Sequence, residues 1–328
     1  MTKFKSSVSL KILSLCLLSF ITLNSCNKEK EPAVTSVVAQ GYLDEVVGLM
    51  KTNSINRKTI DWTVFKAKVD AQAQGAQTIA DTYPAIQLGL TLLGDNHSMY
   101  YTSTGTVIYG NSTAACTDAT IITGTIHEGI GYVKVSTFNG GGIDATKFAQ
   151  SIQDAIKAAD SGSIVGWIVD LRGNLGGNMW PMLAGVGPLL GEGVCGYFLD
   201  PDGNASAWSY QKGSALLNQA ELTKVESAYT VRKANFKVAV LTDRATASSG
   251  EAVAIAFKGR PNTRSFGKAT CGLSTANATN RLSDGALLNL TQSTMANRSK
   301  QGYGSSIQVD EVVVAEKVIA EATSWLLQ

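Results

Sequence analysis

The sequence predicts an α/β protein, with a layered core of strands and helices that follows a small helical subdomain. Short apolar runs typical of buried strands, at residues 164–171 and 237–242, alternate with helix-forming segments along the second part of the chain. Residues from about 36 to 93 instead carry apolar side chains at roughly helical spacing. We therefore expect a helical subdomain over residues 36–100 and an α/β core over residues 101–328.

The elements of the core are expected in a definite order. Alternating β-branched residues predict two early strands, amphipathic spacing predicts the first core helix, and a Leu- and Thr-rich stretch predicts a hairpin near the end. In chain order the segments are strands at 105–109 and 131–135, a helix at 145–159, a strand at 164–171, a helix at 180–190, a strand at 237–242, a helix at 251–258, hairpin strands at 287–294 and a helix at 314–327. In the helical subdomain, Asp61 is expected to cap a helix.

Composition limits the classes of function. The chain has 328 residues, 44% hydrophobic and 16% charged, and is long enough to bury a core without disulfide or metal staples. A net charge of +2 provides no basic field for nucleic acid. The chain has two histidines, His97 and His127, which argues against a zinc site with several histidine ligands. We expect no metal, no organic cofactor and no nucleic-acid partner.

The N-terminus has the pattern of a secretory signal. Three lysines precede an apolar run from Ile12 to Leu23, which is shorter than the roughly 20 residues that a membrane span needs. The run ends in Leu-Asn-Ser-Cys26, which resembles a bacterial lipobox. The resemblance implies that residues 1–25 are removed, that lipidated Cys26 attaches the chain to a bacterial membrane, and that residues 26–35 form a tether. We expect the protein at the bacterial cell envelope, at the outer membrane or the periplasmic face. The alternative is an ordinary cleaved signal with a chance cysteine.

Three segments carry residues suited to catalysis, two in the predicted core and one at the end of the helical subdomain. The segment at 170–178 (DLRGNLGGN) takes a buried strand into a Gly-rich turn, which can direct backbone N–H groups at an oxyanion or simply make a tight turn. The segment at 246–251 (TASSGE) places serines between a strand and a helix, as nucleophile or as helix cap. The segment at 92–98 (LLGDNHS) places His97 in a polar turn, as a base near neutral pKa.

Together the three segments resemble those of the C-terminal processing peptidases and their relative, the tricorn protease core. DLRGNLGG is similar to the strand-and-glycine signature, Ser248-Ser249-Gly250-Glu251 to the nucleophile segment, and Asp95-Asn96-His97-Ser98 to the histidine segment of the tricorn-like branch. The resemblance spans about residues 40–315. It implies a crotonase-like core and a membrane-anchored serine peptidase that acts on peptide or unfolded protein.

The resemblance also implies the role of each site residue. Ser248 would attack the peptide carbonyl while His97 removes its proton, and the resulting acyl-enzyme would be hydrolysed by water. The oxyanion would be held by the backbone N–H of Ser249 and by that of Gly176 or Gly177. The residue that orients His97 stays open among three candidates: Asp95, Asp310 and Glu311.

The base is expected to differ from the lysine of the processing peptidases. Counting 22 residues from Glu251 places the family's lysine position on Leu273, whereas Lys268 falls on an earlier position. A leucine cannot take a proton, so His97 is expected to act as the base, with Lys268 as the alternative. Only about 33 residues separate Ser98 from Gly131, too few for a PDZ domain. The missing lysine and PDZ domain motivate an alternative function, a catalytically silent peptide- or ligand-binding lipoprotein on the same fold.

Several other residues are expected to be structural. Asp170 and Arg172 should hold their turn together, His127 should lie at the surface, and Met179 and its neighbours could line a pocket. Besides Cys26, the mature chain would keep three cysteines without metal-binding spacing, and an oxidising compartment would allow one disulfide. The pairing stays open among Cys116, Cys195 and Cys271.

Overall fold

The computed structural model describes residues 34–117 and 121–328. The predicted signal at residues 1–25, Cys26 and the tether up to residue 33 lie outside the described residues, as do residues 118–120. In the part that is described, no helix is both long and apolar enough to cross a membrane.

Three helices form the N-terminal part, as the apolar spacing predicts: α1 (Val37–Asn53), α2 (Trp62–Gln72) and α3 (Tyr83–Leu92), with a short 3₁₀ turn at Ala80–Thr82. The predicted cap is confirmed, since the carboxylate of Asp61 accepts the N–H groups of Thr63 and Val64 at the start of α2.

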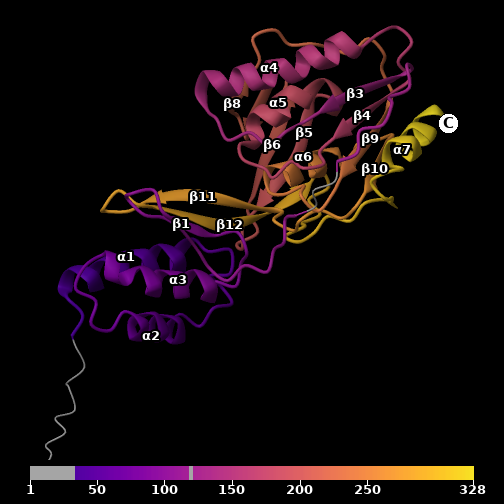
Figure 1. Cartoon of the computed structure of the whole chain (residues 1–328). Helices are drawn as coiled ribbons and strands as arrows, with labels where there is room; N and C mark the ends of the chain where they lie inside the picture. Colours follow the sequence, from indigo (N-terminus) through magenta and orange to yellow (C-terminus); the bar gives the residue numbers. More distant parts are fainter. Residues whose placement is uncertain (1–33, 118–120) are drawn as a thin grey trace, which may run out of the picture. The chain divides into compact units, whose positions relative to one another are not determined.

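The apolar faces of these helices pack against an antiparallel sheet. Leu43 and Leu90 share one buried cluster with Tyr100 and Leu288, which belong to strands of that sheet. Figure 1 shows the helices beside this sheet. Residues 34–328 form one compact unit. The predicted division near residue 100 therefore stays a prediction.

A five-stranded parallel sheet forms the centre of the core. The order is β13-β10-β9-β4-β3, and every neighbouring pair is parallel. The two segments predicted as buried strands, β4 and β9, occupy the middle of this sheet, where both faces are covered. The bounds are β3 (Ile130–Lys134), β4 (Gly166–Asp170), β9 (Lys237–Thr242), β10 (Thr263–Gly267) and β13 (Glu311–Val312).

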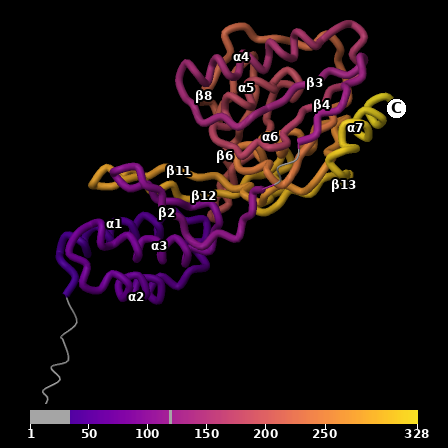
Figure 2. The backbone as a smooth tube through the Cα atoms, in the orientation of Figure 1, coloured from indigo at the N-terminus to yellow at the C-terminus, as the bar shows by residue number. Residues whose placement is uncertain are grey.

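Helices cover both faces of the parallel sheet. Ile168 and Leu241 pack with the C-terminal helix α7 (Val318–Leu327), which lies beside β4 and β9 (Figure 2). On the opposite face, Trp167 and Val240 join a cluster with α4 (Gly142–Ala159), α5 (Met179–Leu190) and α6 (Ser249–Phe257). This alternation follows from the two-residue period of a strand. The predicted α/β fold is confirmed, although α7 begins four residues later than expected.

A second, antiparallel sheet of eight strands has the order β2-β1-β12-β5-β6-β7-β8, with β11 also paired to β12. The segment predicted to hold both strands of a hairpin, 287–294, lies within the single strand β12, which forms a hairpin with β11 instead. Strand β11 and strands β5 to β8 were not predicted. The long strand β12 joins the two ends of the sheet, because Asn289 pairs with Met99 of β1 and Met295 pairs with Phe198 of β5. The bounds are β1 (Met99–Tyr101), β2 (Val107–Tyr109), β5 (Gly193–Leu199), β6 (Ala205–Gln211), β7 (Ser214–Leu217), β8 (Ala220–Lys224), β11 (Thr275–Arg281) and β12 (Leu287–Asn297).

A disulfide between Cys116 and Cys271 settles the open pairing, and Cys195 is buried and free. The bond connects the segment after β2 to the loop before β11, 155 residues away.

Removing this bond with Cys116→Ser and Cys271→Ser is expected to lower the free energy of unfolding by about 2–5 kcal/mol, because the cross-link restricts the unfolded chain. Urea titrations of the wild type and the double variant test this. Reductant should destabilise the wild type to the level of the double variant and leave the double variant unchanged. A wild type that is indifferent to reductant would contradict the prediction.

Candidate active site

The three predicted segments meet at one cleft of about 860 Å³. His97 enters it from the turn after α3, Gly177 from the Gly-rich turn after β4, and Ser248 from the turn between β9 and α6. Strands β11 and β12 supply much of the remaining lining. The turns that carry Gly177 and Ser248 converge because parallel β4 and β9 end at the same edge of their sheet. His97 reaches the cleft from the other side, where its ring contacts Thr275 of β11.

Ser248 occupies a strained position at the start of α6. It is partly exposed, it is the N-cap residue of the helix, and its backbone has φ +51° and ψ −115°. Positive φ is uncommon for a residue other than glycine and is maintained only when the surroundings enforce it. The N–H of Ala247 donates to the carbonyl of Asn174 at 2.9 Å and thereby fixes the turn. Ser248 therefore holds the N-cap position of α6 and also lines the cleft.

The Gly-rich turn packs directly against the Ser248 turn. A Cβ on Gly176 would lie 2.8 Å from both the Ala247 carbonyl oxygen and the Ser248 Cβ, and a Cβ on Gly177 would lie 2.2 Å from the Phe138 carbonyl oxygen. Both glycines have positive φ, 99° and 112°. Only glycine allows this approach without displacing the backbone.

The backbone N–H groups near Ser248 differ in whether they already have a hydrogen-bond acceptor. That of Gly176 donates to the Asn174 side chain at 2.9 Å, and Gly176 is buried. Those of Gly177 and Ser249 have no hydrogen-bond acceptor among the described residues, and both residues line the cleft. The Ser249 hydroxyl donates to the Gly177 carbonyl at 2.5 Å, which holds the two peptide units together. The cleft thus contains two available donors next to Ser248.

His97 lies in a turn shaped by Asp95. The Asp95 carboxylate accepts the N–H of His97 at 2.9 Å and that of Ser98 at 2.7 Å, so it fixes the backbone. The ring Nδ1 instead lies 2.9 Å from the Thr275 hydroxyl of β11. Burial lowers the pKa of His97 to about 4, although the charge of Asp95 acts in the opposite direction. The imidazole is therefore neutral at pH 7 and able to accept a proton.

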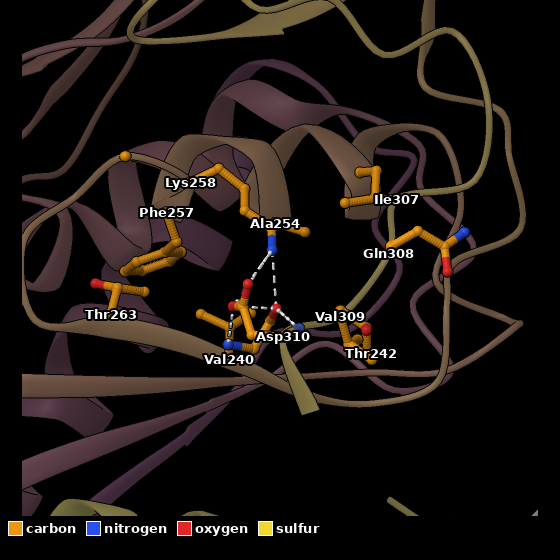
Figure 3. A pocket seen from close by; sticks show the side chains of 12 residues that line it. Val240, Thr242, Ala254, Phe257, Lys258, Thr263, Ile307, Gln308, Val309 and Asp310 are labelled. Atoms are coloured by element: carbon orange, nitrogen blue, oxygen red, sulfur yellow. Dashed lines mark hydrogen bonds and ion pairs between the residues drawn. The ribbon is translucent and has the colours of Figure 1, made fainter. Parts of the chain in front are cut away.

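Asp310 and Glu311, the other two candidates for orienting His97, are wrong, because each is bound to other side chains away from the imidazole. Asp310 accepts hydrogen bonds from Ser265 and Lys258 beside a separate cavity of about 130 Å³, where Lys258 and Asp310 point toward each other (Figure 3). Glu311 pairs with Arg264 at 2.5 Å. The ring partner Thr275 was not predicted, since nothing in the local sequence connects it with a histidine 178 residues away.

Leu273, at the position of the family's lysine, and Lys268, the alternative base, lie at different places. Leu273 lines the cleft with Ser248 and His97. Lys268 is exposed and borders a smaller cavity with Arg172, Thr242 and Asp243. The structure thus brings the leucine, and not the lysine, to the nucleophile.

Buried Glu251 connects the nucleophile turn to the loop before β11. Its carboxylate accepts the Ser248 N–H at 2.8 Å, the Thr270 hydroxyl at 2.5 Å and the Gly272 N–H at 2.9 Å. Burial raises the pKa of Glu251 to about 7, against these hydrogen bonds, which lower it. This role could have been predicted, because a serine followed three residues later by glutamate is the pattern of a capping box.

Ionisation of Glu251 is expected to make stability depend on pH. Its pKa is raised in the folded state, so the stabilisation is fully present below pH 4.5 and is lost as the pH rises toward 7. The loss amounts to about 3 kcal/mol. Urea titrations between pH 4.5 and 8 should show this slope in the wild type and a flatter one in Glu251→Gln, which cannot ionise. Equal slopes in both proteins would refute this assignment.

Asp170, Arg172 and His127, which were expected to be structural, have no place in the lining of the cleft. The Asp170 carboxylate forms buried hydrogen bonds with the Arg172 side chain and holds the turn, and His127 is exposed. Trp167 is buried in the core, whereas Met179 and Trp180 line the cleft. No group of side chains suited to holding a metal ion occurs among residues 34–117 and 121–328.

Comparison with known proteins identifies the family. The profile of peptidase family S41 matches residues 129–313, more than half of the chain. The chain belongs to peptidase family S41. The matched region includes the Gly-rich turn, Ser248 and Glu251, whereas His97 precedes it.

Two curated proteins are similar in sequence to this S41 chain. It is 26% identical over 271 residues to the nisin-resistance protein of Lactococcus lactis subsp. lactis, covering 81% of this chain and 80% of that protein. It is 29% identical over 164 residues to the carboxy-terminal processing protease CtpA of Bacillus subtilis, covering 49% of this chain but only 32% of that protein.

Solved structures show the same fold. A lipoprotein from Streptococcus agalactiae matches with a TM-score of 0.69 and 22% identity, over 90% of this chain and 98% of that one. The photosystem II D1 C-terminal processing protease matches with a TM-score of 0.60 and 14% identity, over 89% and 100%. Membership in family S41 makes peptide-bond hydrolysis the class of activity.

Proposed function

We propose that this S41 chain is a serine peptidase, anchored at the bacterial cell envelope through Cys26, that cleaves peptides through an acyl-enzyme. The observation that supports it most is the meeting of Ser248, neutral His97 and two available backbone N–H groups in one cleft. The lipobox-like sequence at Cys26 supports the anchor, as does the similarity to a structure described as a lipoprotein.

In this mechanism, Nδ1 of His97 carries the ring proton and donates a hydrogen bond to the Thr275 hydroxyl. The lone pair of Nε2 is then free to take a proton. Nε2 takes the proton of the Ser248 hydroxyl as Oγ bonds to the peptide carbonyl carbon. The oxyanion accepts hydrogen bonds from the N–H groups of Ser249 and Gly177, and each such donor typically contributes about 10²–10³ in rate. Gly177 is chosen over Gly176 because the Gly176 N–H already donates to Asn174.

In the remaining steps His97 returns the proton that it has taken. Protonated His97 gives its proton to the leaving amine as the C–N bond breaks. Water then attacks the acyl-enzyme, again losing a proton to His97, and the acid product leaves as Ser248 regains its proton. Glu251 and Thr275 act as positioning residues in this scheme, since they hold the nucleophile turn and the base.

One observation favours the alternative, a catalytically silent binding lipoprotein. The His97 ring is hydrogen-bonded to a threonine, and no carboxylate among the described residues accepts a hydrogen bond from the ring. A triad carboxylate would stabilise the imidazolium that forms during attack. The two proposals therefore differ in turnover and agree in ligand binding.

Digestion of an unstructured protein separates the two. Detergent-solubilised mature protein is incubated with β-casein, and fragments are identified by mass spectrometry beside the Ser248→Ala variant. We expect fragments with the wild type and none with the variant. Identical fragment patterns in both would assign the cleavage to a contaminant, and an uncut substrate would favour the silent binding protein.

A further inference from the structure

Strand β12 gives the scale of the cleft. Its residues Asn289, Ser293 and Met295 all line the cleft, from the end beside Met99 to the end beside Phe198. Six residue steps along a strand correspond to about 20 Å. An extended peptide of about six residues spans such a distance. The cleft is therefore long enough to hold an extended stretch of about six residues.

One end of the cleft is apolar. Four side chains from four separate elements, α5, β5, β7 and β8, line this end and remain partly or fully exposed: Trp180, Phe198, Leu217 and Leu222. We name these four residues the apolar subsite. Leu222 alone is 42% exposed. Convergence of apolar side chains on one concave surface is typical of a ligand site, whereas single exposed leucines need no explanation.

The apolar subsite has a fixed framework. The ring of Phe198 stacks on buried Trp208 with centroids 5.6 Å apart and meets Trp180 edge-on at 6.3 Å. Trp180 belongs to the first turn of α5, three residues after Gly177. The subsite is thus built directly onto the turn that presents the N–H donor next to Ser248.

The lining of the whole cleft is neutral. All 24 described residues that line it have side chains that are apolar, amide, hydroxyl or imidazole, and the imidazole is that of His97. A charged side chain or chain terminus that enters such a cleft loses hydration without gaining an ion partner, which is unfavourable. Apolar side chains, in contrast, gain from leaving water.

We propose that the cleft binds an internal, uncharged stretch of peptide with one bulky apolar side chain seated on Trp180, Phe198, Leu217 and Leu222. This inference names the substrate class of the proposed peptidase and rests on that function for its chemistry. Binding itself does not require turnover.

The test uses the full mature chain with Ser248→Ala, which binds without cleaving. The probes are fluorescein-labelled decapeptides of Ala, Gly and Ser, blocked at both ends, with one central residue varied among Leu, Phe, Asp and Lys. Fluorescence anisotropy gives their dissociation constants. The Leu and Phe peptides are expected to bind at least about tenfold more tightly than the Asp and Lys peptides, the discrimination typical of an apolar pocket.

Two leucines of similar exposure provide a matched pair of variants. Leu222 is 42% exposed in the subsite, and Leu327 is 48% exposed on α7. Added to Ser248→Ala, Leu222→Asp should remove the preference for Leu and Phe and improve binding of the Lys peptide, whereas Leu327→Asp should leave both unchanged. Equal binding of all four peptides, or the same profile for both variants, would overturn the inference.

The experiment distinguishes failure of the apolar subsite from failure of the proposed peptidase activity. Wild-type cleavage of the Leu peptide is followed in parallel. Preferential binding without cleavage would keep the subsite and reject the peptidase. Cleavage without preference at the varied position would keep the peptidase and reject the subsite.

Discussion

The Ser248→Ala variant is expected to retain its fold and to lose peptide hydrolysis by a factor of about 10⁴ to 10⁶, the range seen when a serine nucleophile is removed. The hydroxyl oxygen is the atom that forms the acyl bond, and alanine offers no substitute. Initial rates on a quenched fluorescent peptide, with circular dichroism as a check of folding, measure the effect.

The neighbouring Ser249 supplies the control for this prediction. Its hydroxyl donates to the Gly177 carbonyl, and its backbone N–H, the proposed oxyanion donor, survives in Ser249→Ala. That variant should lose about tenfold or less, since one hydrogen bond contributes about 1 kcal/mol. If Ser249→Ala were the inactive variant and Ser248→Ala the active one, the nucleophile would have been assigned to the wrong serine.

The second large effect is expected for His97→Ala, with a loss of about 10⁴ or more in turnover, because no other group described in the cleft can take the proton of Ser248. The neutral imidazole is the active form, and burial lowers its pKa to about 4. Activity of the wild type should therefore persist to about pH 5 and fall as the pH drops through 4. The acid limb of the pH–rate profile measures this.

A lysine base at Lys268 would give a different pH dependence of activity. A lysine base is active only when deprotonated, so a Ser–Lys dyad would give a rate that rises toward alkaline pH. We expect Lys268→Ala to keep activity within severalfold of the wild type and to leave the acid limb unchanged. Loss of activity in Lys268→Ala with retention in His97→Ala would show that the lysine is the base.

The buried strands and the nucleophile turn were predictable because their signals are local. The runs IVGWIVDL and KVAVLT are short, apolar and rich in β-branched residues, which is typical of strands buried on both faces, and TASSGE contains both the projecting serine and its capping glutamate. The Gly-rich turn was predictable for the same reason, since the sequence shows two consecutive glycines shortly after a buried strand. In the structure both have positive φ and permit the close approach to Ser248.

Other features depend on tertiary contacts that no local pattern encodes. Thr275 reaches His97 only because β11 folds beside the turn after α3, and Cys116 reaches Cys271 across 155 residues. The proposal of Gly177 over Gly176 as oxyanion donor rests on the hydrogen bond from the Gly176 N–H to the Asn174 side chain, which the sequence does not reveal. Strands β5 to β8 were missed because residues such as 205–211 (ASAWSYQ) are half-buried and lack a continuous apolar run.

The central claim is that Ser248 is a nucleophile activated by His97. Labelling with a fluorophosphonate probe, followed by peptide mapping, measures this activation without any knowledge of the natural substrate. We predict a covalent adduct on Ser248 in the wild type and in Lys268→Ala, and none in Ser248→Ala or His97→Ala. A folded wild type that is not labelled, or labelling that survives in His97→Ala, would contradict the account.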